Sequence, residues 1–328
     1  MDKIIGLGNA LVDILVKMGG DDLLNGLNLP KGSMQLVNEE TYKTISEKFK
    51  TLKTRRSTGG AAGNTIDALA KLGAKTGFIG KVGEDDLGKY YADSMKEDGV
   101  DVHLLKGDLS TGVASTFVSV DGERTFATHL GSASTLRAED ITRDLFEGYT
   151  YLFIEGYLLQ DHELILRAMQ LAKEMGLQIC LDMASYNIVL EEREFFDMLI
   201  TRYVDIVFAN ESETEAFTGK GPQEGLHEIA SKCSIAVVKA RIEGSYIKKG
   251  TECIQVPAPP VEKVIDTTGA GDYYAAGFMY GLTCGYSLEK CAQISTILAG
   301  EVIQVLGTEL SAEKWDEIKL NIAEVLRA

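Results

Sequence analysis

The stretch VIDTTGAGDYYAAGFMYG, residues 264–281, joins a glycine-rich turn to a run of small and apolar residues that predicts a helix. We expect this helix to begin near Ala270, where the first N–H groups lack partners within the helix and carry partial positive charge. Gly269 and Gly271 let the backbone turn sharply and let a ligand approach closely. The turn is therefore a candidate cradle for anionic oxygens, although it carries an acid of its own, Asp272. The alternative is that Asp272 is an ordinary helix-starting residue.

Length and charge limit the class of protein. The chain has 328 residues, 45% of them hydrophobic, which suits one large α/β domain or a large domain with a small appendage. A formal net charge of −16 argues against nucleic-acid binding, and no apolar run reaches the roughly 18 residues of a membrane-spanning helix. The opening MDKIIGLGNALVDIL predicts a strand entering a turn rather than a signal peptide. The five cysteines have no C-x-x-C spacing and are interpreted as reduced core residues of a cytoplasmic protein; they are Cys180, Cys233, Cys253, Cys284 and Cys291.

Strand-like and helix-like runs alternate from about residue 76 onward. Several of the strand-like runs are continuously apolar, which is typical of parallel strands buried on both faces. These runs are 151–156, 177–183, 204–210 and 234–240. Residues 270–328 predict three helices broken near Gly285 and Gly307. The pattern predicts an α/β fold with a central, mostly parallel sheet sandwiched by helices, in a single domain spanning residues 1–328.

Another part of the chain predicts a second, smaller sheet. Residues 112–131 alternate apolar and polar on both sides of Asp121-Gly122, which indicates a β-hairpin with a tight turn. Short strand candidates also lie in 15–18 and 33–37. We expect a β lid formed by segments near 13–37 and 101–135, which would exclude water from reactive phosphates. An ordinary edge hairpin is the equal alternative.

Two common nucleotide-binding motifs are absent from the sequence. Gly6-Leu7-Gly8 follows a predicted strand, but the third glycine of G-x-G-x-x-G would fall at Leu11. The helix-packing glycine of a dinucleotide fold is therefore missing. The G-x-x-x-x-G-K-[ST] loop does not occur either.

The stretch at 264–281 suits phosphoryl transfer. Backbone N–H groups of the turn would stabilise the charge that develops on a transferring phosphoryl group, and Asp272 would accept the proton of an attacking hydroxyl. A carboxylate at a helix N-terminus has its charged form favoured, so we expect Asp272 to be a weak base. A loose transition state tolerates a weak base, because most of the catalysis is positioning.

The sequence DTTGAGD closely resembles the second signature of the ribokinase-like (PfkB-type) carbohydrate kinase family, and the adenosine kinases in particular. Residues 57–88, STGGAAGNTIDALAKLGAKTGFIGKVGEDDLG, resemble the first signature, and Asn210-Glu211-Ser212-Glu213 resembles the family's N-x-x-E. The three matches come in family order and span nearly the whole chain. The resemblance implies a ribokinase-like α/β fold with a β lid, and transfer of the γ-phosphate of ATP, with Mg²⁺, to a primary alcohol.

The resemblance also implies roles for residues on the acceptor side. It makes Asp272 the catalytic base and gives the anion hole to Gly269, Ala270 and Gly271. It places the acceptor's hydroxyl groups against five residues: Asn9, Asp13, Gly59, Gly60 and Asn64. A carboxylate such as Asp13 accepts hydrogen bonds from a vicinal diol with both oxygens. For Asn64, a helix cap is the alternative.

On the nucleotide side, the resemblance implies that Asn210 and Glu213 organise water around Mg²⁺ and the phosphates. A helix-start acid is the alternative for Glu213. Lys239 and Gly244 resemble the family's nucleotide-side strand and turn, although Arg241-Ile242-Glu243 make that alignment loose. Thr268 and Gly271 complete the expected ATP contacts.

Two further roles follow from the resemblance. Arg124, on the second strand of the predicted hairpin, would reach phosphate when the lid closes, and a solvated strand arginine is equally possible. Asp266 and Thr268 would lend backbone carbonyls to a K⁺ site beside the anion hole.

The acceptor is expected to be a small molecule. Residues 8–15, GNALVDIL, and 129–136, HLGSASTL, are closer to adenosine kinases than to ribokinases. We therefore favour a nucleoside, adenosine first, with a sugar such as ribose or fructose as the alternative. No nucleic-acid or membrane partner is expected, and the resemblance allows a monomer or a homodimer through the lid.

Overall fold

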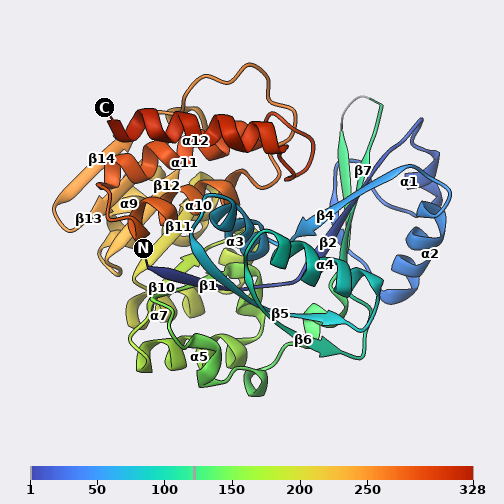
Figure 1. Ribbon diagram of the computed structural model, residues 1–328, viewed down its shortest axis with the longest axis horizontal. Coiled ribbons are helices and arrows are strands. Elements are labelled where there is room, and N and C mark those ends of the chain that lie inside the picture. Colours follow the sequence, from blue (N-terminus) through green and yellow to red (C-terminus); the bar gives the residue numbers. More distant parts are fainter. Residues whose placement is uncertain (1, 121–122, 328) are drawn as a thin grey trace.

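The computed structural model describes residues 2–120 and 123–327, in two sheets of very different size (Figure 1). The large sheet has nine strands in the order β14-β13-β12-β11-β10-β9-β1-β5-β6. The strands from β12 to β6 run parallel, and β13 and β14 are antiparallel additions at one edge. The bounds of its strands are β1 Lys3–Leu7, β5 Lys75–Gly83, β6 Asp101–Gly107, β9 Tyr151–Glu155, β10 Gln178–Asp182, β11 Ile206–Asn210, β12 Ile235–Lys239, β13 Ser245–Lys249 and β14 Glu252–Val256.

Helices cover both faces of the large sheet, as its apolar strands require. Each face of the sheet has its own hydrophobic core. Ile4 of β1 packs into the core on one face, with a first group of helices, and its neighbour Ile5 packs into the core on the other face, with a second group. The first group contains α3 Ala61–Lys71, α4 Asp86–Glu97, α10 Ala270–Thr283, α11 Leu288–Val302 and α12 Ala312–Arg327. The second contains α5 His162–Glu174, α6 Tyr186–Glu191, α7 Arg193–Arg202, α8 Glu211–Thr218 and α9 Pro222–Ala230. The predicted α/β sandwich and its three final helices are confirmed.

The small sheet lies apart from the large one, at the right of Figure 1. Its strand order is β3-β8-β7-β2-β4. The strands are β2 Leu11–Lys17, β3 Met34–Leu36, β4 Thr54–Gly59, β7 Gly112–Val118 and β8 Arg124–His129. Two helices, α1 Asp22–Gly26 and α2 Glu39–Phe49, pack on it around a separate core that includes Phe49 and Phe117.

The composition of the small sheet differs from the one expected. Residues 101–107, assigned from the sequence to the small sheet, form β6 and pair in parallel with β5 in the large sheet. Residues 54–59, for which no strand was expected, join the small sheet as β4 beside β2. The turn expected at Asp121-Gly122 lies outside the described residues.

The cysteines are also less uniform than expected. All five are free, but only Cys180 and Cys291 are buried, while Cys253 is exposed. Cys253 lies on β14, the edge strand, where one side of the chain faces solvent. Within the described residues, no helix is long and apolar enough to cross a membrane.

Candidate active site

The chain crosses between the two sheets at residues 8–10, and two glycines make this crossing tight. Gly60 has φ +86°, and a side chain there would overlap the carbonyl oxygen of Asn9. A side chain on Gly59 would overlap the carboxylate of Asp13, which lies on β2. Four of the residues expected to contact the acceptor, namely Asn9, Asp13, Gly59 and Gly60, are therefore adjacent. Burial and the nearby charge of Asp266 raise the pKa of Asp13 to about 7.

The acceptor side meets the start of α10 through two hydrogen bonds. The Asn64 Nδ2 donates to Asp272 Oδ2 at 2.8 Å, although 208 residues separate them. Thr65 Oγ1 donates to the backbone oxygen of Asp272 at 3.2 Å. Helices α3 and α10 thus hold the first and second sequence motifs together. Asn64 lies inside α3 and its amide serves Asp272, while Gly60 is the N-cap residue of α3.

Asp272 has a different acidity from the one expected. Burial raises its pKa to about 7, the charge of Asp182 raises it too, and the Asn64 hydrogen bond and the Lys239 charge lower it. Desolvation of the carboxylate therefore outweighs the favourable potential at the start of α10. The expectation of a weak base is wrong: Asp272 is matched to proton transfer near neutral pH.

The turn before α10 is shaped by Asp266. Its carboxylate accepts the N–H of Thr268 at 2.8 Å and that of Gly307 at 2.9 Å. Gly269 then adopts a left-handed conformation, φ +76°, and α10 begins at Ala270 as expected. The Ala270 N–H donates to the Thr267 carbonyl at 3.2 Å, so this N–H is already engaged within the turn.

Lys239 lies against the same turn. Its Nζ is 3.2 Å from the position that a Cβ on Gly271 would occupy. The ammonium is held by Asp182 at 2.9 Å, and both side chains are largely buried. Carboxylates that include Asp182 and Glu213 raise the pKa of Lys239 against the opposing effect of burial. A fixed positive charge therefore stands beside the candidate anion cradle.

Asn210 and Glu213 form a capping box at the start of α8. The Glu213 carboxylate accepts the backbone N–H of Asn210 at 2.7 Å and its side-chain amide at 2.6 Å. Burial raises the pKa of Glu213 to about 7. Both carboxylate oxygens are engaged, so this pair fits a magnesium ion that keeps its water shell and not one bound directly. Among residues 2–120 and 123–327, no group of three or more His, Cys, Asp or Glu side chains is arranged to hold a metal ion.

Two carboxylates at strand ends were missed by the sequence reasoning. Asp182 ends β10 and Glu155 ends β9, both at the carboxyl edge of the parallel sheet where α/β proteins bind ligands. Glu155 is 1% exposed; it accepts the N–H of Asn9 at 2.9 Å and that of Ala62 at 2.8 Å. It therefore ties the crossing between the sheets to the start of α3. An acid that closes a continuous apolar run was the signal in the sequence.

Tyr157 is a further residue without a sequence motif. Burial, followed by the carboxylates of Asp272, Glu155 and Asp182, raises its pKa above its usual value. The ring is only partly buried, and its hydroxyl donates to the Ala184 carbonyl at 3.4 Å. An aromatic ring thus lies within the cluster of acids.

Arg124 and Gly244 lie at the edges of this arrangement. Arg124, on β8 of the small sheet, forms an ion pair with Asp266, so it reaches the glycine-rich turn from the opposite sheet. The ion pair engages the Asp266 carboxylate and leaves the backbone carbonyls of Asp266 and Thr268, which were expected to serve a K⁺ site, untouched. Gly244 has φ +88°, and a side chain there would overlap the Val256 carbonyl, which explains the glycine by backbone geometry alone.

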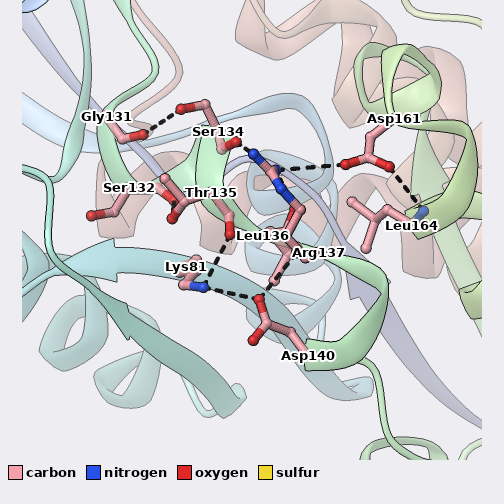
Figure 2. A network of polar contacts seen from close by, with 10 residues as sticks. All are labelled: Lys81, Gly131, Ser132, Ser134, Thr135, Leu136, Arg137, Asp140, Asp161 and Leu164. Atoms are coloured by element: carbon pink, nitrogen blue, oxygen red, sulfur yellow. Dashed lines mark hydrogen bonds and ion pairs between the residues drawn. The ribbon is translucent and has the colours of Figure 1, made fainter.

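The segment that returns from the small sheet to the large one is firmly held. Figure 2 shows Lys81 of β5 donating to the Thr135 carbonyl at 3.0 Å and to Asp140 at 2.9 Å. Arg137 donates to the Ser134 carbonyl and pairs with Asp161. The segment resembling adenosine kinases, 129–136, therefore forms the end of β8 and the 3₁₀ turn Gly131–Thr135, fixed against the large sheet.

This fold and site define a class of phosphotransferase. Residues 35–315 match the model of the pfkB family carbohydrate kinases, and the chain belongs to that family. A 5-dehydro-2-deoxygluconokinase from Listeria monocytogenes is 28% identical over 290 residues, covering 84% of this chain and 89% of its own.

Solved structures agree with the family. A probable sugar kinase from Rhizobium etli superposes with a TM-score of 0.87 at 32% identity, covering 99% of both chains. The adenosine kinase from Sinorhizobium meliloti gives 0.86 at 32% identity, covering 97% of this chain and 99% of its own. The protein is therefore a ribokinase-like kinase, and its family uses ATP.

Proposed function

We propose that the protein transfers the γ-phosphate of ATP to a primary hydroxyl of a nucleoside, with adenosine favoured. The observation that carries the proposal is the Asn64–Asp272 hydrogen bond, because it joins the acceptor-side motif to the anion cradle. In this proposal Asp272 takes the proton of the acceptor hydroxyl. The acceptor oxygen forms the new bond to phosphorus as the bond to the ADP oxygen breaks.

The other residues position the two substrates. Asp13 and Asn9 receive the acceptor's diol beside Gly59 and Gly60. Lys239 and the N–H groups of Gly269 and Gly271 face the transferring phosphate, with Thr268 on the nucleotide side and Gly244 shaping the neighbouring strand.

Asn210 and Glu213 would hold Mg²⁺ through its water shell, and the ion would neutralise phosphate charge. Asp266 and Thr268 would lend backbone carbonyls to a monovalent cation beside the anion cradle. We further propose that the small sheet acts as a lid.

Electrostatics favours an uncharged acceptor. The site gathers the carboxylates of Asp13, Asp272, Glu155, Asp182 and Glu213. The cations that face them, Lys239 and Arg124, are already paired with carboxylates. An acceptor with a carboxylate of its own would be repelled at close range. This supports a nucleoside or a neutral sugar over a sugar acid.

Tyr157 favours the nucleoside. The charges of Asp272 and Glu155 act on its hydroxyl, and a partly exposed aromatic face can stack on a base. The Sinorhizobium adenosine kinase at 32% identity adds to this support. A neutral sugar such as ribose or fructose is the second candidate, since the names of many relatives refer to sugars. The free cysteines agree with the reducing cytoplasm as the compartment.

The test is ADP release with Mg-ATP and four acceptors: adenosine, ribose, fructose and 5-dehydro-2-deoxygluconate. We expect adenosine to give the highest kcat/KM and the anionic acceptor the lowest. Asp272→Asn, which keeps the size of the side chain, should lower turnover by orders of magnitude while calorimetry still detects acceptor binding. Acceptor-independent ADP release throughout would refute the kinase, and faster turnover of a sugar would refute the nucleoside.

A further inference from the structure

A cavity lies beside Asn64 and the start of α10. It has a volume of about 540 Å³ and is walled by α3, α4, the start of α10, residues 308–310 and α12. Asp67 and Lys71 line it from α3, Tyr90 from α4 and Trp315 from α12. None of these four residues has a part in the site described above.

Two buried polar groups in the cavity wall lack partners. Asp67 is 6% exposed, and its Oδ1 has no hydrogen-bond partner within 2–120 and 123–327. Its other oxygen accepts from Lys71 Nζ at 2.6 Å. Trp315 is 5% exposed, and its indole Nε1 also lacks a partner among the same residues. An unpaired buried acceptor and an unpaired buried donor are each costly. Both atoms are almost wholly covered, so a small movement of the wall that opens them to the cavity would let a ligand with a donor and an acceptor satisfy them.

The lining also specifies the charge of a ligand. Five carboxylates face two ammonium groups; they are Asp67, Glu97, Asp98, Glu309 and Asp316 against Lys71 and Lys319. Lys71 is already bound to Asp67 and, at 3.2 Å, to Asp98. Trp315, stacked on Tyr273, and Tyr90 add aromatic surface that attracts cations. The chemistry fits a positively charged ligand with hydroxyl groups.

The cavity walls touch the catalytic residues from behind. Asn64 lines the cavity and donates to Asp272. Tyr273, another lining residue, directly follows Asp272 on α10. Thr308 lines the cavity and lies against Gly269, where a Cβ would be 2.6 Å from its methyl group. A ligand here would therefore contact three elements that carry the anion cradle and its base.

We propose that this cavity is a second ligand site, which binds a small ammonium compound bearing hydroxyl groups and thereby fixes α3 and α10 around Asn64 and Asp272. The proposal needs no knowledge of the phosphate acceptor, and its binding test does not depend on activity.

Trp315 makes the test direct, because it is the single tryptophan of the chain. Tryptophan fluorescence of the whole protein is titrated at neutral pH with tris(hydroxymethyl)aminomethane, whose ammonium form carries three hydroxyls. Pentaerythritol, an uncharged tetra-alcohol of the same shape, is the matched probe. We expect a saturable change with the ammonium probe and a Kd at least about tenfold weaker with the alcohol, because a hydrogen bond to a charged group is lost.

Variants locate the binding. Asp67→Asn should raise the Kd for the ammonium probe by about tenfold. Asp316 is an exposed residue of the lining, so Asp316→Asn should weaken binding of the ammonium probe severalfold without a risk to folding. Glu317→Gln, on the same helix, should leave the affinity for the probe unchanged. Asp13→Ala should also leave it unchanged. A response that is not saturable, that survives both Asp67→Asn and Asp316→Asn, or that disappears in Asp13→Ala overturns the proposal.

Discussion

Replacing either member of the Asp182–Lys239 pair should move the pH dependence of turnover, in opposite directions. The Asp272 carboxyl, with a pKa of about 7, must be ionised to take a proton, so kcat/KM should fall as the pH drops through 7. Lys239 lowers that pKa and Asp182 raises it. Lys239→Met should therefore shift the acid limb to higher pH, and Asp182→Asn should shift it to lower pH.

The size of the shift follows from Coulomb's law. Lys239 Nζ lies 3.2 Å from the Cβ position of Gly271, the residue before Asp272. Unit charges about 8 Å apart interact by about 2 kcal/mol at an effective dielectric constant of about 20. Because one pKa unit equals about 1.4 kcal/mol, we expect Lys239→Met to move the limb up by about one to two pH units. Asp182→Asn should move it down by a similar amount, since it also frees the Lys239 ammonium.

The assay is coupled ADP release across pH 5.5 to 9, roughly the range over which such groups titrate, with thermal melts to verify folding. Breaking a buried ion pair costs about 3–5 kcal/mol, so both variants should melt at lower temperature. Lys173→Met is the control: it breaks the Lys173–Asp205 pair at the opposite end of β10 and should leave the limb in place. If both pair variants shift the limb in the same direction, or neither shifts it, Asp272 is not the group that titrates.

Three further substitutions test the remaining residues. Asp13→Asn should stabilise the ligand-free protein at pH 8. Because the pKa of Asp13 is raised to about 7, its protonated form contributes stability at acid pH, and this stability is lost as the pH rises through 7. The ionised form therefore costs up to about 4 kcal/mol of folding free energy. A melting temperature several degrees higher at pH 8 but unchanged at pH 4 would confirm this, and an equal change at both would refute it. Arg124→Gln removes the ion pair to Asp266 and should lower kcat by about tenfold or more. If kcat is unchanged, Arg124 has only a structural role in the small sheet. Glu155→Gln presents an amide to the N–H donors of Asn9 and Ala62, so it should raise KM for the acceptor and lower the melting temperature; an unchanged KM would limit Glu155 to stability.

Motifs and periodicity in the sequence predicted the main sheet and the distant parts of the site. Continuous apolar runs identified the parallel strands, because burial on both faces leaves no alternation. The pairing of strands could not be predicted in this way, because a strand's partner is decided by contacts far away in the chain. Residues 101–107 were assigned to the small sheet and form β6 of the large one, and no strand was expected at residues 54–59, which form β4 of the small sheet. Asp182 and Glu155 were missed because an isolated acid has no motif, and only the parallel topology shows that both lie at one edge of the sheet.

Burial sets the pKa values of the acids in this site, and no sequence motif records burial. The carboxyls of Asp13, Asp272 and Glu213 all have pKa values raised to about 7, with desolvation as the largest cause. Ionising each of them away from water is unfavourable, and this lowers the stability of the ligand-free protein as the pH rises through 7. A hydroxyl donor at Asp13, a proton for Asp272 and a hydrated cation near Glu213 would each relieve part of that cost. The substrates of a kinase supply all three. The unfavourable burial of these carboxyls lowers the stability of the free protein, and its relief would favour substrate binding.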